Sequence, residues 1–301
     1  MSDLLCLGEP LVEFVRLEDG TYRRGVGGDT SNAAIAAARQ GASVGYITAL
    51  GADRFGESIR SLWQAEKVDA SNVASSPTLQ TGIYFIDPDP AGRFFTYYRK
   101  GSAASQMRPE DLATDAIEAA RCIHLSGITL AVSDDLRATA QTAIDVAKHA
   151  DVAISLDTNL RMKLWDIETA RDVTHTAAKS AKIVITSIDD SLELTGLEAP
   201  DRIAEFYERL GVEIVLVTMG EQGCYLASPD ARAVVAAAPA TPVDSTGAGD
   251  SFAGSFLAWW LETGDPAKAA RSAAIVAAGT VSGLGAVDPI PRREDVLTAL
   301  R

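Results

Sequence analysis

The sequence predicts an α/β protein with a mostly parallel β-sheet, helices on both faces of that sheet, and a small inserted β-sheet. Short apolar runs alternate with helix-like stretches along most of the chain, the order expected of parallel strands joined by helical crossovers. Two aromatic segments break this alternation and are separated by turn residues, which indicates a hairpin. The 301 residues, 47% of them hydrophobic, suffice for one large core or two smaller ones. Because no repeat, low-complexity tract or Ser/Gly linker divides the chain, we expect one domain over residues 1–301.

The core strands are predicted where short apolar runs lie between turn or helix signals. They are Leu4–Leu7, Val44–Leu50, Cys122–Leu125, Val152–Leu156, Ile183–Ile185 and Ile214–Val217. Most are followed by a stretch with helical periodicity, and Asp265 and either Ser133 or Asp134 are suited to cap helix N-termini. The predicted helices are Asn32–Arg39, Glu57–Glu66, Asp134–His149, Ile203–Leu210, Gly249–Leu261 and Pro266–Ser282.

The inserted sheet is predicted from the segments Thr81–Asp87 and Arg93–Arg99, which flank the turn-forming residues Pro88–Gly92. Part of the segment 9–26 would complete this sheet. Residues 9–26 and 80–101 are therefore expected to form a small second sheet.

The two faces of the hairpin differ in chemistry. A period of two along a strand places Tyr97 and Arg99 on one face, and Phe94, Thr96 and Tyr98 on the other. A face that carries tyrosine and arginine is a poor core and a good ligand surface. For Phe85, Phe94 and Phe95 we expect packing roles instead.

Charge and cysteine content restrict the class of partner and the compartment. The 27 basic and 41 acidic residues give a formal net charge of −14, and nucleic acid and anionic membranes repel such a chain. The three cysteines lie far apart without a CxxC spacing, so we expect buried thiols in a reducing compartment. No basic and apolar signal segment opens the sequence, and no apolar run reaches the roughly 18 residues of a membrane span. We therefore expect a soluble, cytoplasmic protein that binds neither nucleic acid nor membrane.

The segment Thr246-Gly-Ala-Gly-Asp250 carries the strongest chemical signal, because it precedes a long apolar helix. Gly247 and Gly249 allow a tight turn that directs backbone N–H groups into one concavity, and a helix N-terminus adds positive potential, as in phosphate sites. Phosphate repels the carboxylate of Asp250, so this residue calls for a role, and deprotonation of an attacking hydroxyl fits. Helix capping is the alternative role, and the segment alone does not decide between them.

This segment resembles the C-terminal signature of the ribokinase/phosphofructokinase-B family of carbohydrate kinases. Val26-Gly27-Gly28 together with Asn32 resembles the N-terminal signature of the same family, and the order and separation of the two also match. The resemblance extends over nearly the whole chain and implies a ribokinase-like three-layer α/β/α fold with a β-sheet lid. It also implies ATP-dependent kinase activity with Mg²⁺.

The resemblance implies the catalytic roles. Gly247, Ala248 and Gly249 would form the anion hole for the migrating phosphoryl group, whose developing charge backbone donors stabilise. Asp250 would deprotonate the acceptor hydroxyl.

An ATP site is implied in the same way, since Val217–Gly223 is similar to the family's nucleotide-binding strand and turn. The residues implied to bind ATP are Ser187, Thr218, Gly220, Gly223, Thr246, Gly247 and Gly249. A turn that only ends a strand is the alternative for Gly220 and Gly223.

The segment that organises Mg²⁺ departs from the family pattern. Asn-x-x-Glu is usual there, whereas this chain has Ser187-Ile-Asp-Asp190. Asp190 could still supply an oxygen ligand or hold a metal-bound water, with a shorter reach than glutamate. A requirement for a monovalent cation stays open.

Several segments resemble one branch of the family, the 2-keto-3-deoxygluconate kinases. They are Gly8–Val12, Gly27–Asn32, Tyr46–Gly51, Tyr97–Ala103, His124–Ile128, Asp157–Arg161 and Leu164–Trp165. The substrate of that branch carries a carboxylate, which a net-negative protein must meet with a cation, preferably a planar guanidinium. Arg99 and Arg161 are the candidates, although Arg161 could instead pair at the surface with Asp157 or Asp166.

The sugar contacts are implied by the resemblance position by position. They are Gly28 and Asn32 at sugar hydroxyls, Tyr84 and Tyr97 as pocket walls, Arg99 and Arg161 at the carboxylate and keto end, and Asp288 as a further contact.

We therefore predict an ATP-dependent kinase that converts 2-keto-3-deoxygluconate to 2-keto-3-deoxy-6-phosphogluconate. The lid would exclude water from the site and pair between subunits in a homodimer or larger homo-oligomer. A fructokinase or ribokinase acting on a neutral sugar is the alternative within the class. A non-catalytic sugar-binding protein is the alternative outside it, and Asp250 argues against that. A nucleotide-binding oxidoreductase is disfavoured because Gly8-Glu-Pro10 stands where a GxGxxG segment is expected.

Overall fold

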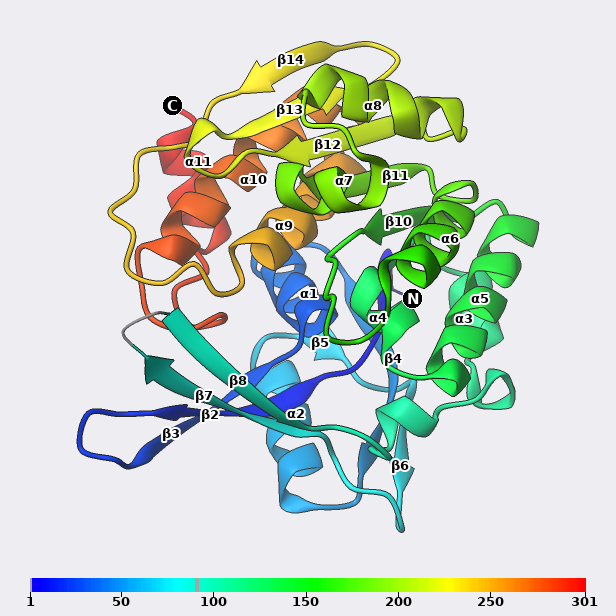
Figure 1. Ribbon diagram of the computed structural model, residues 1–301, viewed down its shortest axis with the longest axis vertical. Coiled ribbons are helices and arrows are strands. Elements are labelled where there is room, and N and C mark those ends of the chain that lie inside the picture. The colour runs from blue at the N-terminus through cyan, green and yellow to red at the C-terminus, as the bar shows by residue number, and fades with distance from the viewer. Residues whose placement is uncertain (1, 90–91) are drawn as a thin grey trace.

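The computed structural model describes residues 2–89 and 92–301, which contain two β-sheets (Figure 1). The strands of the larger sheet are β1 (Leu4–Leu7), β4 (Val44–Gly51), β5 (Val68–Asp69), β6 (Val73–Ser76), β9 (Cys122–Ser126), β10 (Ala153–Asp157), β11 (Ile183–Ser187), β12 (Ile214–Thr218), β13 (Cys224–Ala227) and β14 (Arg232–Val235). They lie in the order β14-β13-β12-β11-β10-β9-β1-β4-β5, and β6 also pairs with β4. From β12 to β5 neighbouring strands are parallel, whereas β13 runs antiparallel to both β12 and β14. The predicted mostly parallel sheet is confirmed.

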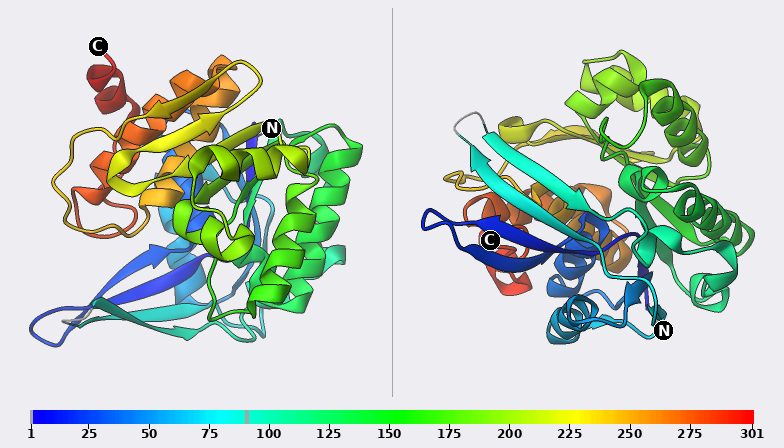
Figure 2. Two further views of the ribbon diagram at one scale, coloured as in Figure 1. Left: turned by 45° about the horizontal axis from the view of Figure 1, so that its top comes forward. Right: turned by 60° about the horizontal axis from the view of Figure 1, so that its bottom comes forward.

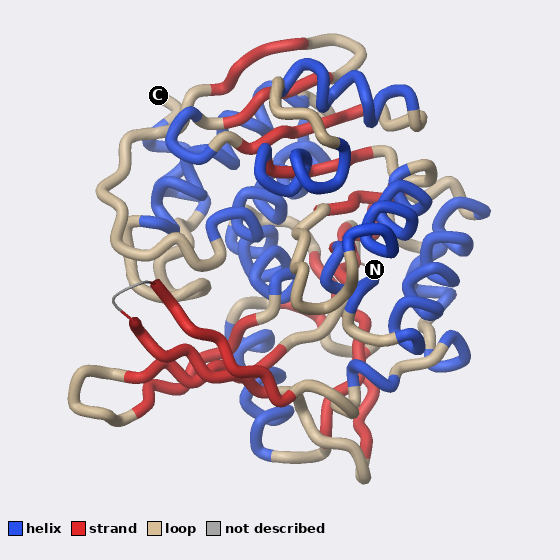
Figure 3. The backbone as a smooth tube through the Cα atoms, viewed as in Figure 1, coloured by secondary structure: helices blue, strands red, loops and turns tan. Residues whose placement is uncertain are grey.

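Helices cover both faces of this sheet (Figures 1 and 3). On one face lie α1 (Asp29–Arg39), α2 (Arg54–Ala65), α9 (Ala248–Thr263), α10 (Pro266–Val281) and α11 (Arg293–Ala299). On the other lie α3 (Thr114–Glu118), α4 (Gly127–Ala131), α5 (Asp134–His149), α6 (Ile167–Ala178), α7 (Ile188–Thr195) and α8 (Pro200–Arg209). Strand alternation produces the two cores, because Leu4 and Cys6 of β1 face the first helix layer and Leu5 and Leu7 face the second. The fold is therefore the predicted three-layer α/β/α architecture.

The predicted elements occur with small shifts at their ends. Every predicted core strand is present, as β1, β4, β9, β10, β11 and β12. Ser133, not Asp134, caps α5, since its Oγ accepts the Leu136 amide over 3.0 Å. Asp265 caps α10 as expected. Within the described part of the chain, no helix is both long and apolar enough to span a bilayer.

The second sheet has four described strands and projects from one end of the larger sheet (Figure 2). Its strands are β2 (Leu11–Arg16), β3 (Tyr22–Gly27), β7 (Ile83–Asp89) and β8 (Gly92–Tyr98), in the order β3-β2-β7-β8. The predicted hairpin corresponds to β7 and β8, and the expected turn residues Pro90 and Ala91 lie outside the described residues. We keep the name lid for this sheet and its connections to the main sheet.

The two faces of the lid have different neighbours. On one face the ring of Tyr84 stacks on that of Tyr97 with centroids 5.4 Å apart, and the Arg99 guanidinium carbon lies 5.5 Å from the Tyr97 ring centre. On the opposite face Phe14 stacks on Phe85 and meets Phe55 of α2 edge-on, with centroids 5.1 and 5.8 Å apart. Aromatic packing thus holds one face against α2, while the other carries the predicted ligand-contacting residues.

Four chain segments connect the lid to the main sheet. One of them contains Glu9, and the other three contact this residue. Glu9 itself precedes β2, and its buried carboxylate forms an ion pair with Arg99 after β8 and accepts a hydrogen bond from Ser102 over 2.6 Å. A methyl group on Gly28, after β3, would lie 2.7 Å from the Glu9 carbonyl oxygen, and one on Gly82, before β7, 3.1 Å from Glu9 Oε1. The four connections are therefore packed around one residue.

Candidate active site

The carboxyl ends of the parallel strands bring together several predicted site residues. Ser187 and Thr218 end β11 and β12 and are direct partners in the register of those strands, and the Thr218 hydroxyl donates to the Thr186 carbonyl over 3.2 Å. Asp157 ends β10 beside them. Ligands of open α/β sheets bind outside this edge, so the strand order alone places the candidate site here.

Helices α1 and α9 point their N-termini at the same place. Gly247 precedes α9 with φ of 77°, and a methyl group on it would lie 2.8 Å from the Ala286 carbonyl oxygen, so glycine is required in this turn. Asp250 lies in the first turn of α9, and Asn32 lies in the first turn of α1. The Asn32 side-chain nitrogen donates to Asp250 Oδ2 over 2.8 Å, so the two predicted signatures meet.

Close packing of α1 against α9 brings Asn32 within reach of Asp250. A methyl group on Gly254 of α9 would lie 2.0 Å from the Ala33 carbonyl oxygen of α1. Only a residue without a side chain lets the helices approach this far. Gly254 therefore positions Asn32 against Asp250 from one turn away.

The carboxyl group of Asp250 titrates far above its ordinary range. Its pKa is raised to about 7, first by removal from water and then by the nearby Asp29 charge, while the Asn32 hydrogen bond and Arg161 oppose the shift. A pKa near 7 suits a general base, because the deprotonated form is available and still accepts a proton readily. Burial likewise raises the pKa of Asp157 well above its usual value, assisted by the charges of Asp250 and Asp190.

Asp190 holds the segment that follows β10. Its Oδ2 accepts hydrogen bonds from the Thr158 hydroxyl over 2.9 Å and from the Leu160 amide over 3.0 Å. The Thr158 hydroxyl also contacts that of Thr186, which in turn contacts Ser191. Asn159 lies between these anchors with φ of 30° and donates to Asp29 Oδ2 over 3.2 Å. Asp190 thus fixes the backbone from which Arg161 projects.

The predicted sugar-contacting residues lie around Tyr97. Tyr97 is 43% exposed, and burial is the main cause that raises its pKa, while Arg99 and Arg161 lie close enough to lower it. Tyr84 is buried beneath Tyr97 and donates its hydroxyl to Glu13 over 2.7 Å. Gly28, with φ of 108°, completes this side of the site.

Arg99 and Arg161 differ in how many of their nitrogens contact other groups of the protein. Arg99 Nε donates to Glu9 Oε2 over 2.5 Å, and Nη2 contacts the same oxygen. Arg161 is exposed, and its Nη1 donates to the Leu160 carbonyl over 2.8 Å. Neither Asp157 nor Asp166 forms an ion pair with Arg161 among the described residues. Arg161 therefore has the freer guanidinium.

Different structural features account for the two glycines that are predicted to bind the nucleotide. A methyl group on Gly223 would lie 2.0 Å from the Val235 carbonyl oxygen, so this glycine is required by the neighbouring β14. Gly220, with φ of 57°, has open space around its Cα. Thr246 lies at the N-terminus of α9, where its amide donates to Asp244 Oδ1 over 2.9 Å.

Asp288 forms no hydrogen bond or ion pair with the other predicted site residues in the described part of the chain. Its side chain is exposed, and its carbonyl oxygen lies 3.4 Å from Nη1 of Arg39 in the last turn of α1. Arg39 Nη1 also donates to the Val287 carbonyl over 2.8 Å, and Ala286 of the same loop packs on Gly247. The Arg39 side chain and the Gly247 turn therefore both hold the loop that carries Asp288.

Sequence reasoning missed Asp29, Glu9, Asn159 and Asp244. Asp244 is buried and accepts the amides of Thr246 and Gly285 on its two carboxylate oxygens, both over 2.9 Å, which fixes the turn before Gly247. Glu9, Asp29 and Asn159 follow a strand or a glycine, and Asp244 precedes the Gly247 turn. An unexplained polar residue at such a position is the signal that could have found them.

The acidic groups do not form a protein-only metal centre. Nowhere in the described ranges do three His, Cys, Asp or Glu side chains converge so as to hold a metal ion. Mg²⁺ commonly binds through one or two carboxylates, waters and substrate phosphates, so the residues present fit Mg²⁺ that arrives with ATP.

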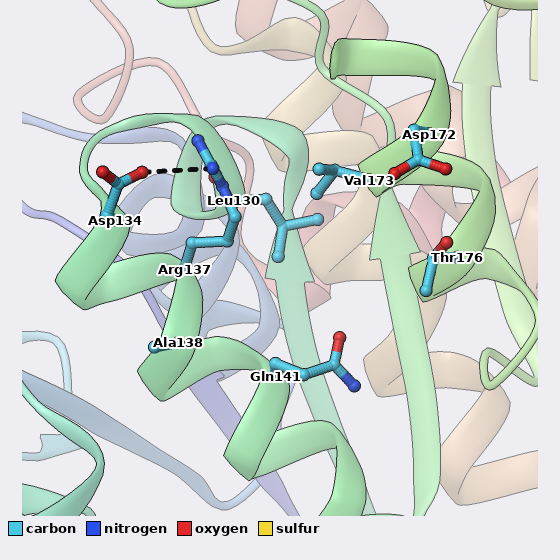
Figure 4. Close-up of a pocket in the computed structure, with 8 residues that line it drawn as sticks. All are labelled: Leu130, Asp134, Arg137, Ala138, Gln141, Asp172, Val173 and Thr176. Carbon is cyan, nitrogen blue, oxygen red and sulfur yellow. Dashed lines mark hydrogen bonds and ion pairs between the residues drawn. The ribbon is translucent and has the colours of Figure 1, made fainter.

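A hollow on the α5/α6 side of the molecule lies apart from this site. It has a volume of about 300 Å³, and its lining residues are Leu130, Asp134, Arg137, Ala138, Gln141, Asp172, Val173 and Thr176 (Figure 4). Arg137 pairs with Asp134 over 3.2 Å and donates to the Leu130 carbonyl, so its charge is already satisfied. None of the predicted site residues lines this hollow.

The fold and the family match place the protein among the ATP-dependent carbohydrate kinases. Residues 1–293 match the model of the pfkB family carbohydrate kinases, and the chain belongs to this family. It is 33% identical to a 2-dehydro-3-deoxygluconokinase of Thermoproteus tenax over 314 residues, covering 100% of this chain and 95% of that one. It is 30% identical to fructokinase-2 of Solanum lycopersicum over 316 residues, covering 99% and 96%. The predicted family and fold are confirmed.

A solved structure shares the whole architecture. An E. coli protein, described as a candidate Ribokinase II and solved in complex with ATP and Mg²⁺, superposes with a TM-score of 0.91 at 25% identity. The superposition covers 100% of this chain and 99% of the other.

Proposed function

We propose that this carbohydrate kinase transfers the γ-phosphoryl group of ATP to the terminal hydroxyl of 2-keto-3-deoxygluconate. The observation that carries the proposal is the Asn32–Asp250 hydrogen bond, which sets a carboxyl group of pKa about 7 beside the glycine turn that begins α9. A base and an anion-binding turn at one point are what phosphoryl transfer to a hydroxyl requires. The similarity to the Thermoproteus tenax enzyme supports the sugar.

In the proposed reaction Asp250 accepts the proton of the substrate hydroxyl. The hydroxyl oxygen forms a bond to the γ-phosphorus as the bond to the bridging β–γ oxygen breaks, and ADP leaves. The amides of Gly247, Ala248 and Gly249 would stabilise charge on the transferring group. Mg²⁺ bound to the ATP phosphates would neutralise part of their charge, and Asp190 would contact it through water. Ser187, Thr218, Gly220, Gly223 and Thr246 would hold ATP.

Asn32 has an atom available for the substrate. Its Oδ1 is buried and has no hydrogen-bond partner among the described residues, while its Nδ2 is engaged by Asp250. A buried acceptor without a donor is costly, and a sugar hydroxyl would satisfy it. This supports the proposed roles of Asn32 and Gly28 at sugar hydroxyls.

The substrate carboxylate would bind mainly to Arg161. Arg161 is exposed and forms no ion pair with a described residue, whereas two nitrogens of Arg99 already contact Glu9. Among the contacts of the described residues, Nη1 of Arg99 is the nitrogen left for a ligand. Tyr84 and Tyr97 would form the wall between the two arginines, and for Asp288 the structure offers no such support.

A neutral sugar remains the second candidate, for a specific reason. Glu9 neutralises Arg99, and Asp29, Asp157 and Asp250 add acidic groups to the site. A fructokinase is also among the relatives with 30% identity. Coupled ADP release with 2-keto-3-deoxygluconate, fructose and ribose, on the wild type and Asp250→Asn, decides between them. Turnover of the keto-deoxy acid alone, lost in Asp250→Asn, is the expected result, and preference for fructose or ribose would overturn the substrate assignment.

We further propose a homodimer or larger homo-oligomer formed through the lid, in the cytoplasm. Exposed aromatic residues on the lid support the first part: Tyr22 is 44%, Phe94 62% and Tyr98 57% exposed. The buried, unpaired cysteines suit a reducing compartment. Light scattering on the wild type and Tyr98→Ser tests the assembly, and a monomeric wild type would refute it.

A further inference from the structure

Arg23 of the lid lies on the face that carries the proposed sugar contacts. In the register of β2 and β3, Arg23 pairs with Val15 and Gly25 pairs with Glu13, so these residues share one face of the sheet. Glu13 is the residue that accepts the Tyr84 hydroxyl, which places Arg23 on the Tyr84 face. Arg24 follows it on the opposite face, paired with Phe14.

The guanidinium of Arg23 reaches across from the lid to the glycine turn at α9. A methyl group on Gly285 would lie 3.4 Å from Arg23 Nη2. The Gly285 amide donates to Asp244 Oδ2, and the adjacent Ala286 packs on Gly247. Arg23 is therefore the neighbour, from the lid side, of the turn that would bind the phosphoryl group.

Arg23 has no partner of its own in the described part of the chain. It is partly buried, yet it forms neither a hydrogen bond nor an ion pair with any described residue. Arg16 of the neighbouring strand, by contrast, lies 3.9 Å from Asp87. A partly desolvated guanidinium without an anion is unfavourable, so this position is suited to a ligand that brings the anion with it.

We propose that Arg23 is a phosphate-binding residue carried by the lid, which contacts the phosphoryl group held at the Gly247–Gly249 turn. This inference rests on the proposed kinase function. The guanidinium offers paired N–H donors to phosphoryl oxygens and adds positive charge where negative charge develops during transfer. The position of the lid would therefore determine whether this positive charge reaches the transferring phosphoryl group.

The test compares Arg23→Ala and Arg23→Lys with Arg24→Ala, a matched arginine on the other face of the same strand. Isothermal titration with ATP and with ADP, without sugar, reports phosphate contacts independently of turnover. We expect Arg23→Ala to weaken ATP binding about 10- to 100-fold, to weaken ADP binding less, and to lower kcat. Arg23→Lys should recover part of the ATP affinity, and Arg24→Ala should behave as the wild type.

Two outcomes would overturn the inference. Equal ATP affinity in Arg23→Ala and the wild type would exclude a phosphate contact. A lower unfolding temperature with equal losses for ATP and ADP would mean that Arg23 only packs the lid against Gly285. A wild type that binds ATP but does not phosphorylate the keto-deoxy acid would count against the proposed substrate and leave the ATP/ADP comparison intact.

Discussion

The side chain of Asn32 donates a hydrogen bond to Asp250 over 2.8 Å, although the two residues are 218 positions apart in the sequence. The bond joins the first turn of α1 to the first turn of α9. It fixes the orientation of the carboxyl group and leaves Asn32 Oδ1 for a ligand. The proposed base and a proposed sugar contact are therefore one unit.

Asp250→Asn should lower kcat by about 10²- to 10⁴-fold, because an amide cannot accept the hydroxyl proton. The amide is nearly isosteric with the carboxyl group, so sugar binding should change little. Coupled ADP release measures kcat, and titration of the sugar provides the control. Substantial turnover in Asp250→Asn would remove Asp250 from the role of base.

The rate should rise with pH through the titration of Asp250. Its pKa is raised to about 7, and only the deprotonated form accepts a proton, so kcat/KM should fall below about pH 7 and level off above it. Asp29→Asn removes a charge that raises this pKa and should shift the acid limb to lower pH. Asn32→Ala removes a hydrogen bond that lowers it and should shift the limb upward. Shifts of the same sign in both variants would contradict this electrostatic account.

Asp250 should also reduce stability at alkaline pH. Its folded-state pKa of about 7 lies above the ordinary value of 3.8, so the folded state holds its proton where the unfolded chain has lost it. The free energy of unfolding therefore decreases as pH rises from about 4 to 7. Asp250→Asn should unfold at a higher temperature than the wild type at pH 8, and the difference should diminish towards pH 4. Equal unfolding temperatures at both pH values would refute this.

Loss of the hydrogen bonds to Asp190 should raise KM for the sugar more than it raises the Mg²⁺ requirement. Thr158→Val deletes one hydrogen bond to Asp190 Oδ2 and loosens the backbone that carries Arg161. We expect KM for the sugar to rise about 5- to 10-fold, corresponding to about 1 kcal/mol for one hydrogen bond. Steady-state kinetics at several Mg²⁺ concentrations separate the two effects. If Asp190 acts mainly on the metal, Asp190→Asn will raise the Mg²⁺ requirement and Thr158→Val will leave both constants unchanged.

Gly254→Ala should impair the protein without touching the site. The added methyl group would lie 2.0 Å from the Ala33 carbonyl oxygen and would force α1 and α9 apart. A loss of about 1–3 kcal/mol of stability is expected from overpacking, together with reduced kcat from the displaced Asn32. Denaturant unfolding and ADP release measure both quantities. Unchanged values would show that the helices can separate at no cost.

Much of the fold could be predicted because its signals are local. Apolar runs such as Leu4–Leu7 and Ile214–Val217 are buried on both faces, and buried parallel strands produce that pattern. The antiparallel extension β13 and β14 was not predicted, since these short segments become strands through the pairing of β13 with β12 and of β14 with β13. Tertiary context, not propensity, decides at such an edge.

The candidate site likewise contains residues that the sequence indicates and contacts that it does not. The glycine turn before an apolar helix singles out Asp250 in the sequence, whereas Asn32 was singled out by the family resemblance. The engagement of Arg99 by Glu9 could not, because the two lie 90 residues apart and come together only when the lid meets the main sheet. Asp288 was assigned by position in the sequence, and the contact of its loop with Arg39 could not be predicted, because the two residues lie 249 positions apart.

Because all four lid connections pack around Glu9, we predict that the lid rotates about this residue. A rigid-body rotation of the sheet then needs changes in backbone dihedral angles at only a few residues, among them Gly28 and Gly82. The Glu9–Arg99 ion pair at this pivot is buried, and buried pairs are screened far less by salt than exposed ones. We therefore expect the opening rate of the lid to depend little on ionic strength, in contrast to the binding of its charged substrates.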